Sequence, residues 1–288
     1  MASRADGLGG SFVHGDFDLD QAVLDALPIP VTEVISSHAY GQWVWARQAK
    51  VLCKLPDGER VYYFLKVTTG ESDFEMTEGQ FESDKAIYDV SSTFCPKPFT
   101  WGQYKATPGP ATYFLLSEFR EVGKQPPEPM RFAARLADLH KRSISPTGKF
   151  GFHTVTCHGK APQLTDCWEE SWETLYRKQL SHVFEVDRQK QAPYPEYEFY
   201  AQLVLEHSVP RLLRPLQSEG RSIKPCLVDG NIWDGNTATD METGEPFIFD
   251  GSAFYAHNEF EFGNWRTPRH RLSSKSSLSS SWYIVWAD

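Results

Sequence analysis

The stretch Cys226–Asp250, CLVDGNIWDGNTATDMETGEPFIFD, constrains the fold more than any other part of this chain. It predicts short strands separated by Gly-containing turns, and the last two strands, on either side of the turn 240–244, form a predicted hairpin. That hairpin would present Asn236 and Asp250 at the same end. An amide oxygen and a carboxylate are hard oxygen ligands of the kind that Mg²⁺ accepts together with phosphate oxygens. The stretch therefore predicts a magnesium site.

The spacing within this stretch is typical of the catalytic loop of kinases. In such a loop an aspartate acts as the catalytic base, a metal-binding asparagine follows five residues later, and a second metal-binding aspartate arrives on a later strand. Asn236 and Asp250 fit the metal-binding positions, but the residue five positions before Asn236 is Asn231. The stretch therefore predicts a kinase-like metal site with a neutral side chain at the position of the base.

Length and composition argue against several classes of protein. At 288 residues the chain is long enough for one large domain or two lobes. A net charge of −9 gives no support for a nucleic-acid partner, which usually requires a basic surface. The five cysteines are an odd number without a CxxC pair, which argues against a zinc site and against a disulfide framework.

The apolar runs of the sequence are short. No apolar run approaches the roughly 20 residues of a membrane span, and the first residues, MASRADGLGGSF, lack an apolar signal core. We therefore expect a cytoplasmic protein in a reducing compartment, without a membrane partner, and we expect a monomer.

A β pattern dominates the first part of the chain. Residues 1–30 contain a predicted short helix near Asp18–Leu27, and from Val31 to Val67 apolar residues alternate with polar ones around a Pro-Asp-Gly turn. The strand VYYFLKV carries Lys66 among apolar residues, where an unpaired ammonium group would be costly to bury. Two interpretations stay open here: an edge-strand lysine whose tip reaches solvent, or a lysine that meets an anion in a cleft.

Helical periodicity increases toward the C-terminal half. Glu71–Val90 predicts a helix behind the lysine-bearing strand. A strand at Ala111–Phe119 is followed by GKQPPEP, whose three prolines mark a linker, so we place the boundary between lobes near 119–128. Further helices are predicted at Met130–Arg142, Asp166–Val183 and Glu196–Gln217.

Taken together, these segments resemble the fructosamine/ketosamine 3-kinase family, which includes the protein-ribulosamine 3-kinases. The resemblance runs from about residue 31 to 266 in the family's order, and WDGNTATD and AHNEFEFGNWR are similar to its fungal type. It is specific as a set and is carried by FLKV (64–67), FLLSEF (114–119), RLADLH (135–140), FGF (150–152), the helix with Trp168 and Trp172, WDGN (233–236) and IFDGSAFYAHNEFE (248–261).

The resemblance implies a fold and a division into lobes. The fold would be α+β and two-lobed, protein-kinase-like, with a small β-rich N-lobe, a hinge near Ser117–Phe119 and a larger, mainly helical C-lobe. Because the family pattern stops before the last helices of the family, we also expect the C-terminus to be truncated. The expected parts are an N-terminal extension (1–30), the N-lobe (31–122), the C-lobe (123–271) and an atypical tail that need not fold (272–288).

The resemblance also implies an activity and its residues. ATP with Mg²⁺ would phosphorylate the 3-hydroxyl of ketosamines, either ribulosamine and fructosamine adducts on protein lysines or small ketosamines. The resulting ester is unstable and releases the sugar, so the family serves protein deglycation. The match implies catalytic roles for Asn231 and Asp229, contacts to ATP from Lys66, Gln80, Glu118 and Phe119, Mg²⁺ binding by Asn236 and Asp250, and substrate contacts from Trp172, Trp233, His257 and Glu259.

The sequence departs from the family pattern at charged positions. Where the family has His-Gly-Asp, this chain has Asp-Gly-Asn at 229–231, so the side chain at the base position cannot accept a proton at neutral pH. The helix carboxylate expected to pair with Lys66 aligns with Gln80, although Glu78 or Glu82 could compensate after a small shift.

These departures leave three hypotheses open. The first is an active ketosamine 3-kinase. The second is an ATP-binding pseudokinase, or a decayed paralogue, without useful turnover. The third is a small-molecule kinase of the aminoglycoside or choline type, which would predict an acidic acceptor pocket without the FYAHNEFE segment at 254–261. Membership of the ketosamine kinase family is the expectation we carry forward.

Overall fold

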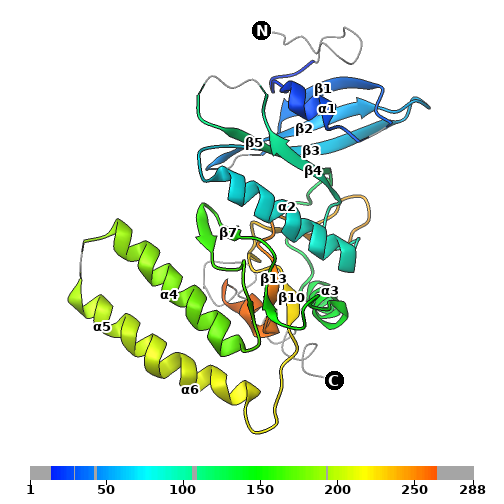
Figure 1. Ribbon diagram of the computed structural model, residues 1–288. Coiled ribbons are helices and arrows are strands. Elements are labelled where there is room, and N and C mark those ends of the chain that lie inside the picture. The colour runs from blue at the N-terminus through cyan, green and yellow to red at the C-terminus, as the bar shows by residue number, and fades with distance from the viewer. Residues whose placement is uncertain (1–13, 29, 42–43, 106–108, 193, 265–288) are drawn as a thin grey trace.

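An antiparallel sheet forms the N-terminal lobe of the protein (Figure 1). The computed structural model describes residues 14–28, 30–41, 44–105, 109–192 and 194–264, and among these residues five strands pair in the order β1-β2-β3-β5-β4. Val51 and Cys53 are buried between more exposed neighbours, so the predicted alternation is confirmed. The strands are β1 (Glu33–Ala39), β2 (Ala46–Lys54), β3 (Arg60–Thr69), β4 (Pro98–Gln103) and β5 (Thr112–Glu118).

The chain before β1 contributes to the core of this lobe. The short helix α1 (Gln21–Asp25) falls within the predicted helical segment, and its Val23 and Leu24 share a buried cluster with inward-facing residues of β2 and β3. Phe17 and Leu19 belong to the same cluster. Part of the expected N-terminal extension therefore packs on the sheet.

The helix α2 (Asp73–Val90) lies between the sheet and the C-terminal lobe (Figure 1). The helix predicted at Glu71–Val90 is thus confirmed, with a start two residues later. It contacts β3, β4 and β5 above, and α3 (Pro129–Arg142) and β7 (Thr156–His158) below. Because it touches both lobes, α2 is able to couple them.

The helices of the C-terminal lobe differ in two places from the predicted ones. The helix predicted at Asp166–Val183 begins only at Trp172, because β9 (Trp168–Glu169) pairs with β6 (Phe150–Gly151) and the Ser171 side chain then caps α4 (Trp172–Lys190). The other difference concerns the predicted helix Glu196–Gln217, which is not one regular helix. Its prolines at 210 and 215 lack the N–H that a regular α-helix uses, and the segment divides into α5 (Pro195–Leu203), a π-helical turn (Val204–Ser208), α6 (Val209–Leu213) and a 3₁₀ turn (Arg214–Gln217).

Short strands build the centre of the C-terminal lobe. In its described part, four strands pair in the order β10-β13-β6-β9, and two hairpins, β7–β8 and β11–β12, project from this centre. A buried cluster with Leu136, Phe150, Leu227 and Phe254 packs around the small sheet. The strands not yet given are β8 (Ala161–Gln163), β10 (Cys226–Val228), β11 (Thr237–Thr239), β12 (Pro246–Ile248) and β13 (Phe254–Ala256), and a 3₁₀ turn follows at Asn258–Phe262.

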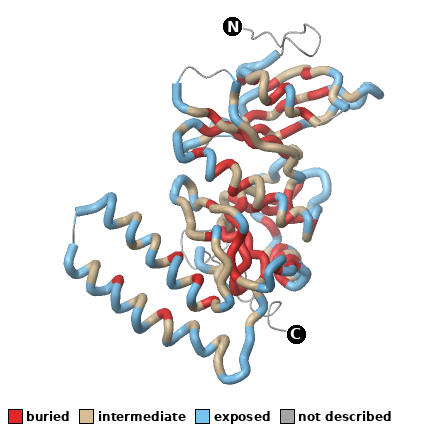
Figure 2. The backbone as a smooth tube through the Cα atoms, viewed as in Figure 1, coloured by how far each residue is buried: buried red, intermediate tan, exposed pale blue. Residues whose placement is uncertain are grey.

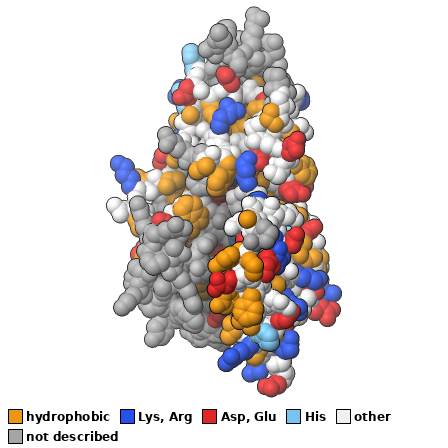
Figure 3. Space-filling view, turned by 90° about the vertical axis from the view of Figure 1, so that its left-hand side faces the viewer, with side chains coloured by type: hydrophobic (Ala, Val, Ile, Leu, Met, Phe, Trp, Pro, Cys, Tyr) orange, Lys and Arg blue, Asp and Glu red, His pale blue; other side chains and the backbone are white. Residues whose placement is uncertain are grey.

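The helices α4, α5 and α6 form an arm at one side of the C-terminal lobe, and Figure 2 shows that most of the arm is exposed or only partly buried. Figure 3 views the molecule from that side, and hydrophobic side chains gather on the lower part of this face. Large apolar side chains of the arm that are more than half exposed include Val183, Tyr194, Phe199 and Tyr200.

Within the described part of the chain, no helix combines the length and the apolar character that crossing a membrane requires. The expected tail, residues 272–288, lies outside the described residues.

Candidate active site

A cavity of about 440 Å³ opens between the two lobes. Its walls come from β3, α2, the end of β5 and the end of β12, so segments far apart in the sequence meet there. Lys66, Gln80, Glu118 and Asp250, which the sequence analysis singled out, all line it. Four of the predicted site residues therefore meet in this cavity.

Lys66 points into this cavity from the middle of the N-lobe sheet. Its strand β3 lies between β2 and β5, and the residue is 6% exposed, so the interpretation as an edge lysine is wrong. Its Nζ donates to Gln80 Oε1 at 2.7 Å and forms an ion pair with Asp250. The buried ammonium thus meets an acid from the C-terminal lobe and an amide from α2.

Glu78 and Glu82 do not compensate for the glutamine at position 80. Glu82 Oε2 lies 3.0 Å from Nε2 of His153, and Glu78 faces Thr154 at 3.5 Å. The acid of α2 that does reach the cavity is Asp84, which is 5% exposed. Burial raises the pKa of Asp84 to about 7, against the opposing effect of a hydrogen bond from the Gly251 N–H.

The predicted metal ligands lie at one end of a hairpin, as expected. β11 and β12 pair with Thr237 opposite Ile248, and the Phe249 N–H donates to Asn236 O at 3.2 Å, which brings Asn236 and Asp250 together. Asn236 Nδ2 donates to Asn231 O at 3.0 Å, whereas the buried Asn236 Oδ1 has no hydrogen-bond partner among the described residues. A buried, unpaired amide oxygen and a carboxylate at the same end of a hairpin fit a hard cation such as Mg²⁺.

Asp250 has a backbone conformation that is unusual for its type. Its φ of 61° lies in the left-handed region, which side chains other than glycine enter at some energetic cost. Such strain is typical of functional positions, where the surrounding contacts over-determine the conformation. Here the contacts include Lys66 and the hydrogen bond that Asn231 Nδ2 donates to Asp250 O at 2.9 Å.

The loop 229–231 is held from several directions. The Glu261 carboxylate accepts hydrogen bonds from the N–H groups of Asp229 (2.7 Å) and Gly230 (2.9 Å), and His158 Nε2 donates to Gly230 O at 2.6 Å. Gly230 has a φ of 74°, and a Cβ there would lie 2.6 Å from Ser252 O, so only glycine fits. The backbone at the base position is therefore rigidly placed.

The two candidate catalytic side chains point in different directions. Asp229 is 1% exposed, and its Oδ1 accepts from the Asn231 N–H at 3.0 Å, so it faces the interior. Burial, followed by the charge of Glu261, raises the pKa of Asp229 well above its usual range. Asn231 is partly exposed, and because its Nδ2 bonds to Asp250 O, its Oδ1 is the atom left for a ligand.

The residues expected on the substrate side are more scattered. Trp172 is 3% exposed and packs against the rings of Phe150, Tyr176 and Phe260, so it belongs to the core. His257 is also buried, whereas Glu259 is exposed and Trp233 is partly buried. The structure brings none of these four side chains into the lining of the cavity.

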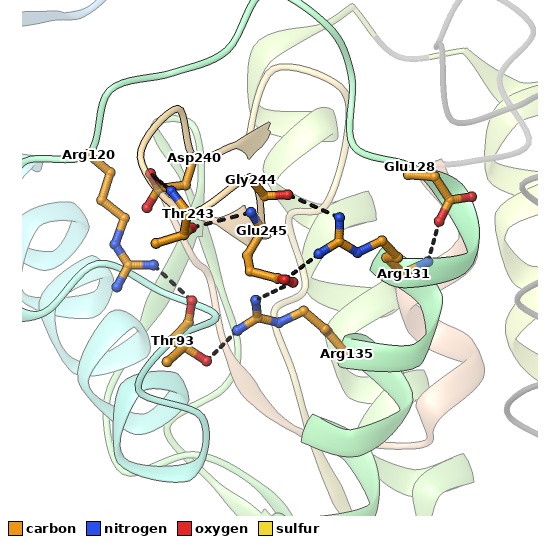
Figure 4. A network of polar contacts seen from close by, with 9 residues as sticks. All are labelled: Thr93, Arg120, Glu128, Arg131, Arg135, Asp240, Thr243, Gly244 and Glu245. Atoms are coloured by element: carbon orange, nitrogen blue, oxygen red, sulfur yellow. Dashed lines mark hydrogen bonds and ion pairs between the residues drawn. The ribbon is translucent and has the colours of Figure 1, made fainter.

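The expected hinge is tied to the hairpin that carries the predicted metal ligands. Glu118 lines the cavity, and its carboxylate accepts from Arg120 Nη2 at 2.9 Å, while the Phe119 ring packs edge-on against Tyr40. Figure 4 shows the network behind the hinge: Arg120 donates to Thr93 O at 2.8 Å, and Arg135 of α3 reaches both Thr93 and Glu245. Arg131 joins the same turn of the hairpin through Gly244 O at 3.2 Å.

Three side chains that line the cavity or hold the loop 229–231 were not found from the sequence: Asp84, His158 and Glu261. Each is a single polar residue in a segment that has other residues of similar polarity nearby, such as Glu82 near Asp84 and Glu259 near Glu261. Periodicity shows which face of an element is apolar, but it does not show which acid is buried.

Known proteins are similar to this chain in sequence. A sequence model of the fructosamine kinase family matches residues 47–267. A chloroplastic protein-ribulosamine 3-kinase from Oryza sativa subsp. indica is 33% identical over 202 residues, covering 70% of this chain and 55% of the rice protein. The ketosamine-3-kinase of Mus musculus is 28% identical over 228 residues, covering 71% of this chain and 69% of the mouse protein. This chain spans about half the length of the rice relative.

Solved structures agree on the fold. A protein from Haemophilus somnus 129PT that is described as a fructosamine-3-kinase superposes with a TM-score of 0.66 at 15% identity, covering 88% of this chain and 77% of that one. An aminoglycoside phosphotransferase in complex with AMP-PNP and hygromycin B gives 0.57 at 14% identity, covering 91% and 80%. The expected two-lobed, protein-kinase-like fold is therefore confirmed. Because the family match also spans more than half of the chain and contains Lys66, Asn231, Asn236 and Asp250, this protein belongs to the fructosamine kinase family.

Proposed function

We propose that this chain binds ATP with Mg²⁺ in the cavity between its lobes and phosphorylates the 3-hydroxyl of ketosamines. The substrates would be ribulosamine or fructosamine adducts of protein lysines, or small ketosamines, and loss of the phosphorylated sugar would deglycate the amine. One observation carries the proposal: Lys66 of one lobe meets Asp250 of the other, and the same end of the hairpin carries Asn236 with its unpaired Oδ1. The names of the rice and mouse relatives support the choice of acceptor.

Several of the predicted site residues have a proposed part in holding the nucleotide. Lys66 would bind the α- and β-phosphates, and the hinge at Glu118 and Phe119 would face the adenine. Asn236 Oδ1 and the Asp250 carboxylate would hold Mg²⁺, which neutralises charge on the phosphate oxygens when it is bound. Phosphoryl transfer depends more on such positioning and charge than on covalent chemistry, so these side chains account for much of the proposed catalysis.

Asn231 would limit the rate of the proposed phosphoryl transfer. Its Oδ1 can orient the attacking hydroxyl, but a neutral amide does not take up the proton. The interior orientation of Asp229 supports no role for that residue as a substitute base. By the usual contribution of general base catalysis, turnover would be lower by roughly 10²–10⁴ than with a carboxylate at this position.

A nucleotide-binding pseudokinase is the second candidate function. The asparagine at position 231 and the glutamine at position 80 favour it, because both replace an expected carboxylate with an amide. A kinase of the aminoglycoside or choline type has less support, because the likeness to aminoglycoside phosphotransferases concerns the fold alone.

Asn231→Asp separates these functions. We expect slow ATP consumption by the wild type with a ribulosamine or fructosamine substrate, and a rise of up to roughly 10²–10⁴ in Asn231→Asp, because the variant regains a proton acceptor. Steady-state ATP consumption measures both. Asn264→Asp, the same change at an exposed residue, serves as the control and should leave the rate unchanged. No wild-type turnover with recovery in Asn231→Asp would establish the pseudokinase, and equal rates in both would remove Asn231 from the mechanism.

Binding of the nucleotide can be measured without turnover. Mg-ATP at about 100 times its Kd should stabilise the folded wild type by about 2.7 kcal/mol and raise its Tm. Lys66→Ala and Asp250→Ala should lose most of this rise, whereas Lys85→Ala on the exposed side of α2 should keep it. Thermal-shift curves with and without Mg²⁺ provide the measurement. Full shifts in both cavity variants would show that ATP binds elsewhere.

A further inference from the structure

Asp84 lies beside the cavity, and none of the roles proposed above uses it. It is 5% exposed and lines the same cavity as Lys66 and Asp250. One turn of α2 separates it from Gln80, so the two side chains lie on the same face of the helix. An acid buried to this extent needs hydrogen bonds or an opposite charge to stay ionised.

Hydrogen bonds fix the Asp84 carboxylate between the two lobes. Its Oδ2 accepts from Gln80 Nε2 at 3.3 Å, and its Oδ1 accepts from the Gly251 N–H at 3.1 Å. The neighbouring Ser83 adds a parallel connection, because its hydroxyl oxygen accepts from the Ala253 N–H at 2.8 Å. The face of α2 that carries Gln80 is thereby fastened to the segment that carries Asp250.

These contacts close into a ring that crosses the cleft. The NH₂ end of Gln80 is turned to Asp84, which leaves its oxygen for Lys66 Nζ at 2.7 Å. Lys66 then pairs with Asp250, and Asp250 precedes Gly251, whose N–H returns to Asp84. Because a carboxylate only accepts hydrogen bonds, an ionised Asp84 determines which end of the Gln80 amide faces Lys66.

Lys66 has one direct acidic partner among the described residues. Its side chain is 7% exposed, and the carboxylate that pairs with it is that of Asp250. Under the proposed function the same carboxylate also binds Mg²⁺, so Asp250 would have to serve both cations. Asp84, one amide group away from Lys66, is the next acid in the cavity.

We propose that Asp84 is a positioning residue of the nucleotide site: through Gln80 it supplies negative charge behind Lys66, and through the Gly251 N–H it holds Asp250. This inference rests on the proposed ATP site. It explains how a chain with glutamine at position 80 keeps its lysine in place, since the acid lies one helical turn further along. The ring then needs one carboxylate at either position 80 or position 84, and not at both.

Exchanging the acid and the amide tests this directly. In Asp84→Asn, the new NH₂ group meets either the NH₂ group of Gln80 or the Gly251 N–H, so one hydrogen bond of the carboxylate is lost or Gln80 has to turn its oxygen away from Lys66. In Gln80→Glu, two carboxylates meet at the distance of a hydrogen bond. In the double variant Gln80→Glu/Asp84→Asn the carboxylate contacts Lys66 directly, while the new amide can donate to it and still accept from Gly251. The two single variants should therefore be impaired, and the double variant should recover.

Calorimetric titration with Mg-ADP measures the effect on binding. We expect each single variant to bind roughly tenfold or more weakly, since a charge-assisted hydrogen bond is broken. The double variant should return to within roughly twofold of the wild type. Asp89→Asn, the same substitution at an exposed acid of α2, should leave the Kd unchanged. Unchanged Kd in Asp84→Asn, or no recovery in the double variant, would overturn the positioning role.

Urea unfolding of the four proteins without nucleotide provides a second, independent measurement. If the ring exists, the loss in the free energy of unfolding of the double variant should be smaller than the sum of the losses of the two single variants. Strictly additive losses would overturn the ring, whatever the nucleotide does. If instead the wild type fails to bind Mg-ADP, the proposed function fails and the nucleotide role of Asp84 fails with it, while non-additive unfolding would still establish the structural ring.

Discussion

Buried side chains hold the loop 229–231 in place, and Glu261 is central to this. Its carboxylate accepts from the N–H groups of Asp229 and Gly230, and it is 3% exposed. His140 Nε2 lies 3.4 Å from the same carboxylate. Because Asn231 follows directly in the chain, the position of its side chain depends on an acid 30 residues further along the sequence.

Glu261→Gln should therefore loosen this loop. The substitution keeps the shape of the side chain but places an NH₂ group against one of the backbone N–H groups, so a charge-assisted hydrogen bond becomes a clash of donors. We expect the free energy of unfolding to fall by about 1.5–3 kcal/mol, as measured by urea denaturation. Glu259→Gln, two residues away and exposed, should change it by less than about 0.5 kcal/mol. Equal losses of stability in the two variants would show that Glu261 does not hold the loop 229–231 in place.

For single residues, the sequence predicted the positions of those that belong to a motif, and it missed the side chains that hold the motif in place through tertiary contacts. Asn236 and Asp250 could be placed because turn residues fix the ends of their hairpin. The sequence left Glu78 or Glu82 open as partners of Lys66 after a small shift, but α2 carries several acids close together, and which of them faces the cleft depends on tertiary packing. The buried position of Trp172 follows the apolar stripe of its helix rather than the family resemblance.

Among the elements, α2 packs on two sides, against the N-lobe sheet and against the C-terminal lobe. Gly79 marks the point where its backbone meets the C-terminal lobe, because a Cβ there would lie 2.4 Å from Val155 O. The adjacent residue is Gln80, which bonds to Lys66. Any shift of α2 away from β7 would therefore also displace a side chain of the cavity.

Gly79→Ala tests this close approach. Alanine favours helix over glycine by about 1 kcal/mol, so an uncrowded site would gain stability. Here the backbone carbonyl cannot move aside freely, and we expect a net loss of about 1–3 kcal/mol in the free energy of unfolding, together with weaker binding of Mg-ADP. Lys85→Ala on the exposed side of the same helix should stay within about 0.5 kcal/mol of the wild type. A stabilised Gly79→Ala variant would show that α2 and β7 are not in tight contact.

Elements with strong local signals were predicted well, and those shaped by tertiary contacts were not. The hairpin β11–β12 and the strand β3 follow from turn residues and alternation. The late start of α4 does not, because Trp168 and Glu169 become a strand only by pairing with Phe150 and Gly151, about 18 residues earlier. Such a pairing has no signature in the local sequence.

For the whole molecule, the two lobes share part of one core. Ile87 of α2, with Phe94 and Cys95 after it, belongs to the buried cluster of the C-terminal lobe. The N-lobe predicted at 31–122 therefore contributes residues to the packing of the lobe predicted at 123–271, and the exact boundary stays a prediction. A backbone hydrogen bond from Ile248 N to Phe94 O, at 2.9 Å, crosses the same region.

A shared core predicts that the lobes unfold together, and Ile87→Ala tests this. Ile87 is fully buried, so its truncation should lower the free energy of unfolding by about 2–5 kcal/mol. Native-state hydrogen exchange should show this loss equally in the amides of β3 and β5 and in those of α3 and β10, because opening one lobe exposes the core of the other. Ile144→Ala, the same truncation at a residue that is 78% exposed, should alter neither set. A loss confined to the amides of α3 and β10 would mean that the N-lobe unfolds as an independent unit, and the coupling of Lys66 to Asp250 across the cleft would then have to be maintained by the ligand rather than by the fold.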